Sequence, residues 1–156
     1  MAIFDGLGHI ALKVRDLDAS IAFYNAIGFP EMLRLLDEKG APWIVYHRIN
    51  DNLYLELFPG GRDRTVPAEI SHATGLFHLC LTVSDADAAE AKLNKAGIKL
   101  SRPRNPKAGI DGNRGMWIED PDGNRIEIME MAANCIQHQA VKNLQAGKPP
   151  QALRLF

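Results

Sequence analysis

Gly75-Leu76-Phe77-His78-Leu79-Cys80-Leu81-Thr82-Val83 is the stretch that decides the fold, because the chain carries a near-copy of it in Leu7-Gly8-His9-Ile10-Ala11-Leu12-Lys13-Val14. A shift of 69 positions superposes His9 on His78 and also aligns later pairs: Asp16 with Asp85, Asp18 with Asp87, Asn25 with Asn94, and Gly28 with Gly97. Both copies alternate in the manner of a strand, with aliphatic residues on one face and the histidine beginning the other. The sequence therefore predicts two equivalent strands, each with a histidine in the same place.

Two glutamates repeat in the same way. Glu56 lies in Asn52-Leu53-Tyr54-Leu55-Glu56-Leu57-Phe58, and Glu127 lies in Arg125-Ile126-Glu127-Ile128-Met129, on the faces opposite the aliphatic side chains. A carboxylate flanked by branched aliphatic residues is costly to bury unless something pairs with it. A divalent cation held by both histidines and both glutamates would remove that cost.

Composition narrows the class of partner. The chain has 156 residues, 46% of them hydrophobic, which is enough to bury a core. Its 18 basic and 19 acidic residues nearly cancel, so no charge pattern points to nucleic acid or to a membrane surface. Neither a membrane span nor a signal peptide is evident, and Cys80 and Cys135 fit reduced thiols. We expect a cytoplasmic protein with a small-molecule substrate.

The order of predicted elements is strand, helix and three strands, given twice. The first repeat covers residues 7–58, with a helix from Asp16 or Asp18 to about Ile27 and later strands at about 31–37, 42–49 and 52–58. A turn-rich linker at 59–74 leads to the second repeat at 75–131, with a helix at about 86–96 and strands at about 98–100, 114–119 and 125–130. Residues 1–131 are thus predicted to form one paired βαβββ domain of the α+β class, followed by a C-terminal helix and tail at 132–156.

These repeats, the openings Gly8-His9-Ile10-Ala11-Leu12 and Phe77-His78-Leu79-Cys80-Leu81, and the ending Asp120-Pro121-Asp122-Gly123 followed by Glu127 resemble the vicinal oxygen chelate superfamily. The resemblance spans about residues 7 to 131. It implies a curved mixed sheet around a metal cavity, with helices outside. It also implies a homodimer, since in many similar proteins two chains share one metal site.

Within that superfamily, the order His9, Glu56, His78, Glu127 is similar to the metal ligands of glyoxalase I, also called lactoylglutathione lyase. Two neutral imidazoles and two carboxylates balance the charge of a divalent nickel, cobalt, zinc or manganese ion, and an octahedral ion would keep two positions open for adjacent substrate oxygens. The resemblance implies a lyase or isomerase that moves a proton through an enediolate stabilised by the metal, with Glu127 as the base. The substrate would be a hemithioacetal or a hydroxy carbonyl compound.

The chain departs from glyoxalase I at two positions. Lys13 stands where that family has an arginine for glutathione, and Gly60 stands where it often has an asparagine. Glutathione is therefore an open question. The alternatives are an epimerase acting next to a carbonyl, an extradiol-type dioxygenase, and a ligand-sequestering protein similar to bleomycin-resistance proteins.

Four further residues are candidates for substrate contact. Lys13 shares the face of His9, Tyr54 and Phe58 flank Glu56, and Cys80 follows His78 by two positions. For Cys80, a small buried filler is the commoner role of a lone cysteine. His47, His72 and His138 have no neighbour at the spacing of metal ligands, so we expect them in loops or on the surface.

Overall fold

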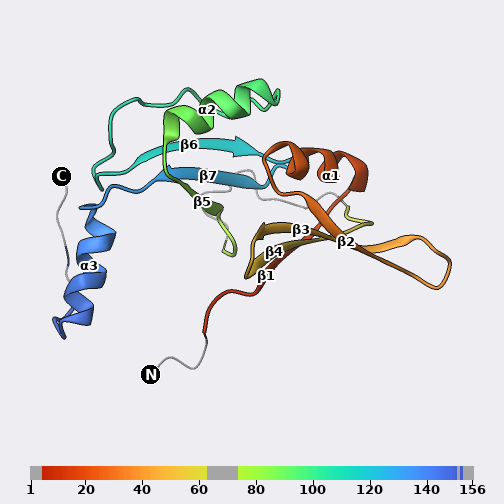
Figure 1. Ribbon diagram of the computed structural model, residues 1–156, viewed down its shortest axis with the longest axis horizontal. Coiled ribbons are helices and arrows are strands. Elements are labelled where there is room, and N and C mark those ends of the chain that lie inside the picture. Colours follow the sequence, from red (N-terminus) through yellow and green to blue (C-terminus); the bar gives the residue numbers. More distant parts are fainter. Residues whose placement is uncertain (1–4, 63–73, 151, 153–156) are drawn as a thin grey trace. The chain divides into compact units, whose positions relative to one another are not determined.

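The computed structural model describes residues 5–62, 74–150 and 152, and these divide into two compact units. One unit comprises the residues through Phe77 together with Asp120–Asn124, and the other comprises His78–Glu119 and the residues from Arg125 onward. The described elements follow the predicted order with one exception (Figure 1). His72 and most of the linker lie outside the described residues.

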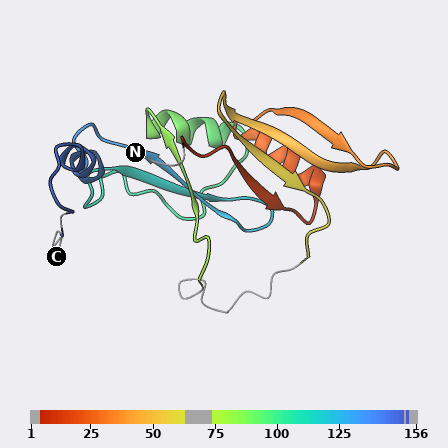
Figure 2. The same cartoon turned by 90° about the horizontal axis from the view of Figure 1, so that it is seen from below.

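The first unit is a four-stranded mixed sheet with one helix. Its strands are β1 (His9–Lys13), β2 (Glu31–Leu36), β3 (Pro42–Asn50) and β4 (Leu53–Phe58), in the order β1-β4-β3-β2, with β1 parallel to β4. Helix α1 (Leu17–Ala26) lies along one face of this sheet, as Figures 1 and 2 show. The side chain of Asp16 accepts a hydrogen bond from Ala19 N, and Gly28 has a φ of 95°, so both predicted helix boundaries are confirmed.

The second unit repeats the plan with one strand fewer. It contains β5 (Leu79–Val83), α2 (Ala86–Lys95), β6 (Arg114–Glu119), β7 (Arg125–Glu130) and α3 (Ile136–Gln145), with sheet order β5-β7-β6. Helix α2 lies over the β6 and β7 strands (Figure 1). The strand predicted at 98–100 is wrong: this segment is irregular, and its neighbour Ser101 makes one backbone hydrogen bond, to Trp117 O at 2.8 Å.

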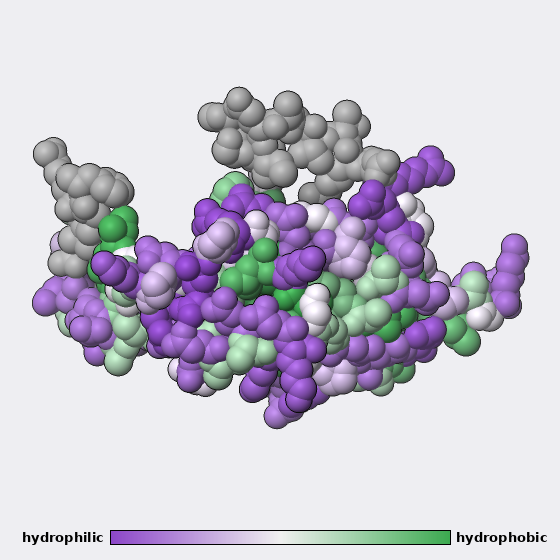
Figure 3. Space-filling view, turned by 90° about the horizontal axis from the view of Figure 1, so that it is seen from above, coloured by the Kyte–Doolittle hydropathy of each residue, from purple (hydrophilic) through white to green (hydrophobic). Residues whose placement is uncertain are grey.

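Each sheet has an aliphatic face that the helix covers and a polar face that carries the predicted site. The buried aliphatic side chains include Val14, Val45, Leu55, Leu57, Met116, Ile118, Ile126 and Ile128. From α1, the buried residues are Ser20 and Tyr24, whereas Phe23 and Ile27 are half-buried. The face of the molecule in Figure 3 is mainly hydrophilic. Among the described helices, none has the length and apolar character needed to cross a bilayer.

Candidate metal and substrate site

The first unit brings His9 and Glu56 together. His9 begins β1, while Glu56 lies in the middle of β4, which pairs with β1 on one side and β3 on the other. His9 Nε2 and Glu56 Oε2 are 3.8 Å apart, and the glutamate side chain is 12% exposed. The Tyr54 ring stacks on the His9 ring with a centroid distance of 5.6 Å, so an aromatic side chain fixes the plane of the imidazole.

The second unit brings His78 and Glu127 together in an equivalent way. His78 immediately precedes β5, and its Nε2 lies 3.3 Å from Glu127 Oε2. The Glu127 side chain is 17% exposed. Trp117 meets the His78 ring edge-on at 4.9 Å between centroids. A histidine, a glutamate and an aromatic ring are thus in contact on the polar face of each sheet.

The residue opposite each glutamate is also aromatic. Tyr46 pairs with Glu56 across the β3–β4 hairpin, and Trp117 pairs with Glu127 across the β6–β7 hairpin. Burial, followed by the nearby Glu56 carboxylate, raises the pKa of Tyr46 above its ordinary value. The sequence analysis did not identify Tyr46 or Trp117 as site residues. The predicted hairpins could have done so, because a turn centred on residue 51 pairs Tyr46 with Glu56, and a turn centred on residue 122 pairs Trp117 with Glu127.

Each histidine–glutamate pair has the spacing of two ligands of one metal ion. Bonds of about 2.1 Å to nitrogen and oxygen at right angles place the two donor atoms about 3 Å apart. The separations of 3.3 and 3.8 Å both exceed this value, that of His9 and Glu56 by more. In the described chain, no three His, Cys, Asp or Glu side chains are grouped closely enough to hold an ion, so the structure gathers the four predicted ligands as two pairs.

The remaining candidates of the first unit lie on the polar face of its sheet. Lys13 pairs with Phe58 in the β1–β4 register, and Lys13 Nζ lies 3.9 Å from the position that a Cβ on Gly60 would occupy. The Lys13 side chain is exposed and Phe58 is half-buried. Along β1 and β4, His9 therefore lies before the level of Glu56, and Lys13 and Phe58 lie after it, at the C-terminal ends of the two strands.

Cys80 lies directly opposite Glu127 in the β5–β7 register and is exposed, so its expected role as a buried filler is wrong. Desolvation, with a smaller contribution from the Glu127 carboxylate, raises the pKa of the Cys80 thiol to about 11. At neutral pH this thiol is protonated, which makes it a weak nucleophile.

A second correction concerns His47. This side chain is fully buried, and its Nδ1 lies 2.7 Å from the Phe29 carbonyl oxygen, to which a neutral ring would donate. The Tyr24 ring lies at 6.0 Å between centroids. His47 is therefore part of the packing between α1 and the first sheet, away from the face that carries His9 and Glu56.

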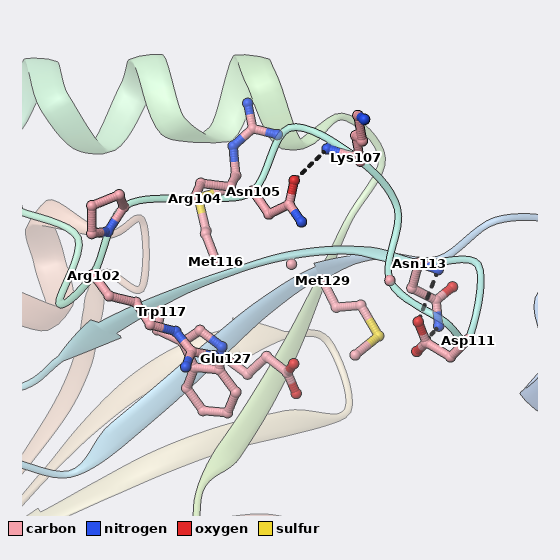
Figure 4. A pocket seen from close by; sticks show the side chains of 13 residues that line it. Arg102, Arg104, Asn105, Lys107, Asp111, Asn113, Met116, Trp117, Glu127 and Met129 are labelled. Carbon is pink, nitrogen blue, oxygen red and sulfur yellow. Dashed lines mark hydrogen bonds between the residues drawn. The ribbon is translucent and has the colours of Figure 1, made fainter. Parts of the chain in front are cut away.

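A pocket of about 430 Å³ opens in the second unit beside Glu127 (Figure 4). Its floor comes from β6 and β7, through Trp117, Glu127 and Met129, and its rim comes from the irregular segment between residues 102 and 113. This volume suits a small organic molecule. A candidate base and a cavity for substrate thus occur within one unit.

Comparison with known proteins identifies the family. Residues 6–128 match the model of the Glyoxalase/Bleomycin resistance protein/Dioxygenase superfamily. The chain belongs to this superfamily. The match covers both sheets up to Ile128 and therefore includes all four predicted ligands.

Individual members of the superfamily similar to this chain have different activities. An ethylmalonyl-CoA/methylmalonyl-CoA epimerase of Cereibacter sphaeroides is 31% identical over 122 residues, covering 76% of this chain and 90% of the relative. A lactoylglutathione lyase of Escherichia coli O157:H7 is 30% identical over 128 residues, covering 78% and 90%. A glyoxalase family protein from Enterococcus faecalis has the same fold, with a TM-score of 0.68 at 24% identity, covering 83% of this chain and all of that one.

Proposed function

We propose that this superfamily member is a metal-dependent, glyoxalase-I-like lyase or isomerase that acts on a small molecule with two adjacent oxygens. The observation that supports the proposal is the pair of equivalent His–Glu contacts, at 3.8 Å in one unit and 3.3 Å in the other. Repetition of the same two donor types on the same face of two sheets is not expected of ordinary surface residues.

His9, Glu56, His78 and Glu127 are the residues that would hold the ion, which we propose to be nickel, cobalt, zinc or manganese. When bound, the ion supplies Lewis acidity toward adjacent substrate oxygens, which makes the neighbouring C–H more acidic. Two neutral imidazoles and two carboxylates balance its charge, and bringing both pairs to one ion requires either the two units of one chain or a homodimer. The proposal includes the homodimer.

Glu127 is the residue we assign as the base. It lines the pocket, its carboxylate is largely shielded from water, and Trp117 lies across the hairpin from it. A carboxylate in this position takes the proton from the carbon of a substrate in the pocket and returns it to the adjacent carbon. We assign Glu56 as a ligand only. Lys13, Tyr54, Phe58 and Cys80 complete the proposed substrate contacts.

An epimerase is the second candidate. The similarity to the Cereibacter sphaeroides epimerase favours it, because that relative is as similar to this chain as the lactoylglutathione lyase is. Gly60, where glyoxalase I often has an asparagine, also leaves glutathione an open question. Both reactions use a base to remove a proton next to a carbonyl, so the roles assigned to the four residues are the same.

The experiment begins with the metal. Untagged protein is stripped with EDTA and titrated with nickel, cobalt, zinc or manganese. It should bind one ion per chain, because each chain supplies two His–Glu pairs, and elemental analysis after dialysis measures the bound metal. His9→Ala and His78→Ala should each weaken metal affinity on the order of a hundredfold, since each removes a ligand. Lys99→Ala is the control, because it changes an exposed residue that is not a proposed ligand, and it should bind the metal normally. Failure of every metal to bind would leave ligand sequestration as the function.

Solvent exchange then tests the reaction. Loaded enzyme in deuterium oxide is given methylglyoxal with glutathione in one assay and a methylmalonyl thioester in the other, and the product is examined for deuterium at the reacting carbon. Glu127→Gln should lower the rate by about a hundredfold or more while the protein stays folded. Equal losses in Glu56→Gln and Glu127→Gln at saturating metal would contradict the assignment of Glu127 as the base.

A further inference from the structure

The positive charges around the pocket are not equivalent. Arg104 is nine-tenths buried, and its guanidinium is paired with Glu90, at 2.7 Å, and with Asp87. Asp111, the other acidic residue of the lining besides Glu127, accepts hydrogen bonds from Asn113 and Gln137. The carboxylate partners of Arg104 and the amide partners of Asp111 are thus supplied by the protein itself, although Arg104 Nη1 is buried without a hydrogen-bond partner among the described residues.

Two lining cations, Arg102 and Lys107, have no carboxylate within 4 Å in the part of the chain that the structure describes. Figure 4 shows that they differ in direction: the Lys107 side chain points away from Glu127, whereas the Arg102 side chain lies beside Trp117. Arg102 is therefore the lining cation that contacts Trp117, the residue paired with the proposed base Glu127 across the β6–β7 hairpin.

The guanidinium of Arg102, an exposed residue, lies over the ring of Trp117. The central carbon of that group lies 5.3 Å from the centroid of the Trp117 ring, within the range of a cation–π contact. Arg125 lies over the same ring at 4.8 Å, and His78 contacts its edge. A guanidinium that lies on an aromatic ring keeps its N–H groups available in the plane, where they match the two oxygens of a carboxylate or phosphate.

We propose that Arg102, supported by Trp117, binds an oxyanion of the substrate, a carboxylate or a phosphate, at the end of the pocket next to Glu127. That the oxyanion belongs to the substrate rests on the proposed function. The oxyanion site itself depends only on the second unit. His78 and Glu127, which would hold the metal, lie at the edge of Trp117 and across the hairpin from it, whereas Arg102 lies over the Trp117 ring.

The test measures oxyanion binding without metal. Trp43 and Trp117 are the two tryptophans of the chain, so Trp43→Phe leaves Trp117 as the reporter. In EDTA and at fixed ionic strength, succinate and inorganic phosphate are titrated while Trp117 emission is recorded, and uncharged succinamide is titrated alongside. We expect at least one of the two anions to give a saturable change and succinamide to give none.

Variants locate the site. Arg102→Ala should raise the dissociation constant of the anion on the order of tenfold, and Arg102→Lys, which keeps the charge but loses the planar fork, should raise it several-fold. Lys107→Ala, which removes the same charge from the same loop, should change it less than twofold. Ligand-observed NMR of the succinate methylene signal gives the same comparison where a substitution alters the emission of Trp117.

Three outcomes overturn the proposal: no anion binding, equal binding of succinamide, or equal losses in Arg102→Ala and Lys107→Ala. The last would mean a general attraction to a basic loop. Because EDTA is present throughout, a failure to bind metal in the separate metal titration leaves this result unaffected. A protein that binds metal but shows no Arg102-dependent anion binding would retain the proposed function without this site.

Discussion

The two repeats carry the same His–Glu pair but differ at the edge of the sheet. In the first repeat, β2 pairs along β3 and completes a four-stranded sheet. In the second, the segment after α2 is irregular and contains Pro103 and Pro106, which lack backbone N–H donors; Ser101 N donates to Trp117 O of β6. A loop therefore takes the place of a fourth strand in the second repeat, and this loop forms the rim of the pocket. The two repeats thus carry equivalent His–Glu pairs, and in the second repeat a pocket lies where the first has a fourth strand.

The hairpin turns next to the two glutamates also differ. The β3–β4 turn carries Asp51, whose side chain is 85% exposed and pairs only with Arg48 among described residues. The β6–β7 turn, Asp120-Pro121-Asp122-Gly123-Asn124, is part of the first unit, where the carboxylate of Asp120 is 5% exposed and accepts the Tyr24 hydroxyl at 2.8 Å. Burial, and then the Asp120 charge, raise the pKa of Tyr24 far above its ordinary value, so this hydroxyl remains a donor.

The largest effect that we expect comes from removing that carboxylate. Asp120 also accepts hydrogen bonds from Asp122 N, Asn124 N and Asn124 Nδ2, at 3.0, 2.7 and 2.8 Å. Asp120→Ala leaves buried donors without an acceptor, so it should lower the free energy of unfolding by about 3 kcal/mol. Urea denaturation followed by circular dichroism measures the loss.

Asp51→Ala is the matched control, because it removes the aspartate of the other turn. Its exposed ion pair should contribute no more than about 0.5 kcal/mol. Similar losses in both variants would mean that the two turns have equivalent structural roles, and the contrast drawn here between the turns would be wrong.

Local features of the second repeat could be predicted from the sequence, whereas its long-range contacts could not. The strands at 114–119 and 125–130 were predicted to the residue, since alternation and the turn at Asp120-Pro121-Asp122-Gly123 are local signals. Gly123 N donates to Asp120 O at 2.9 Å, which confirms that turn. The contact between Tyr24 and Asp120 joins residues 96 positions apart, and no local pattern encodes it.

The candidate site shows the same limit. The duplication predicts that both histidines and both glutamates meet at one ion, and the structure has His9 beside Glu56 and His78 beside Glu127 within each unit. Convergence of both pairs on one ion depends on how units or chains assemble, which strand alternation does not specify. His47 illustrates the opposite error: its burial follows from the approach of the Phe29 carbonyl after α1, a tertiary contact.

A smaller effect should follow from a glycine that only the first repeat has. Gly61 N donates to Val14 O at 2.8 Å, and a Cβ at Gly61 would lie 2.8 Å from Val14 C and 2.9 Å from Val14 O. The second repeat has Ala132 at the offset that relates Glu56 to Glu127, so an equally close backbone approach is not required there. Gly61→Ala should destabilise the protein by about 1–3 kcal/mol in urea denaturation.

Gly8→Ala serves as the control, because a Cβ at Gly8 meets no atom within 4 Å. It should change the free energy of unfolding by less than about 0.5 kcal/mol. If Gly61→Ala were equally neutral, the β1 and β4 strands would have to separate easily at this end, and the first sheet would be less constrained than its hydrogen bonds indicate.

The smallest effect concerns an ion-pair network that only the second helix has. Glu130 accepts a hydrogen bond from Ala86 N at 2.7 Å and pairs with Arg114, which also pairs with Asp87 at 2.8 Å. The Ala86 N–H, followed by Arg114, lowers the pKa of Glu130, and Arg114 and Arg104 lower that of Asp87. In the first unit, α1 begins with the Asp16 cap and has no equivalent carboxylate from a neighbouring strand among the described contacts.

Because the pKa of each of these carboxyl groups is lower in the folded state, their contribution to stability is present above the ordinary carboxyl pKa, near 4, and is lost as the pH falls through the lowered value. Glu130→Gln removes one of the titrating groups. Between about pH 5 and pH 3, the urea midpoint of this variant should therefore fall less steeply than that of the unmodified protein. Asp18→Asn, in the first turn of α1, should leave the steepness unchanged. Equal flattening in both variants would show that acid sensitivity arises from net charge, and the anchoring of α2 by Glu130 would then not distinguish the second repeat from the first.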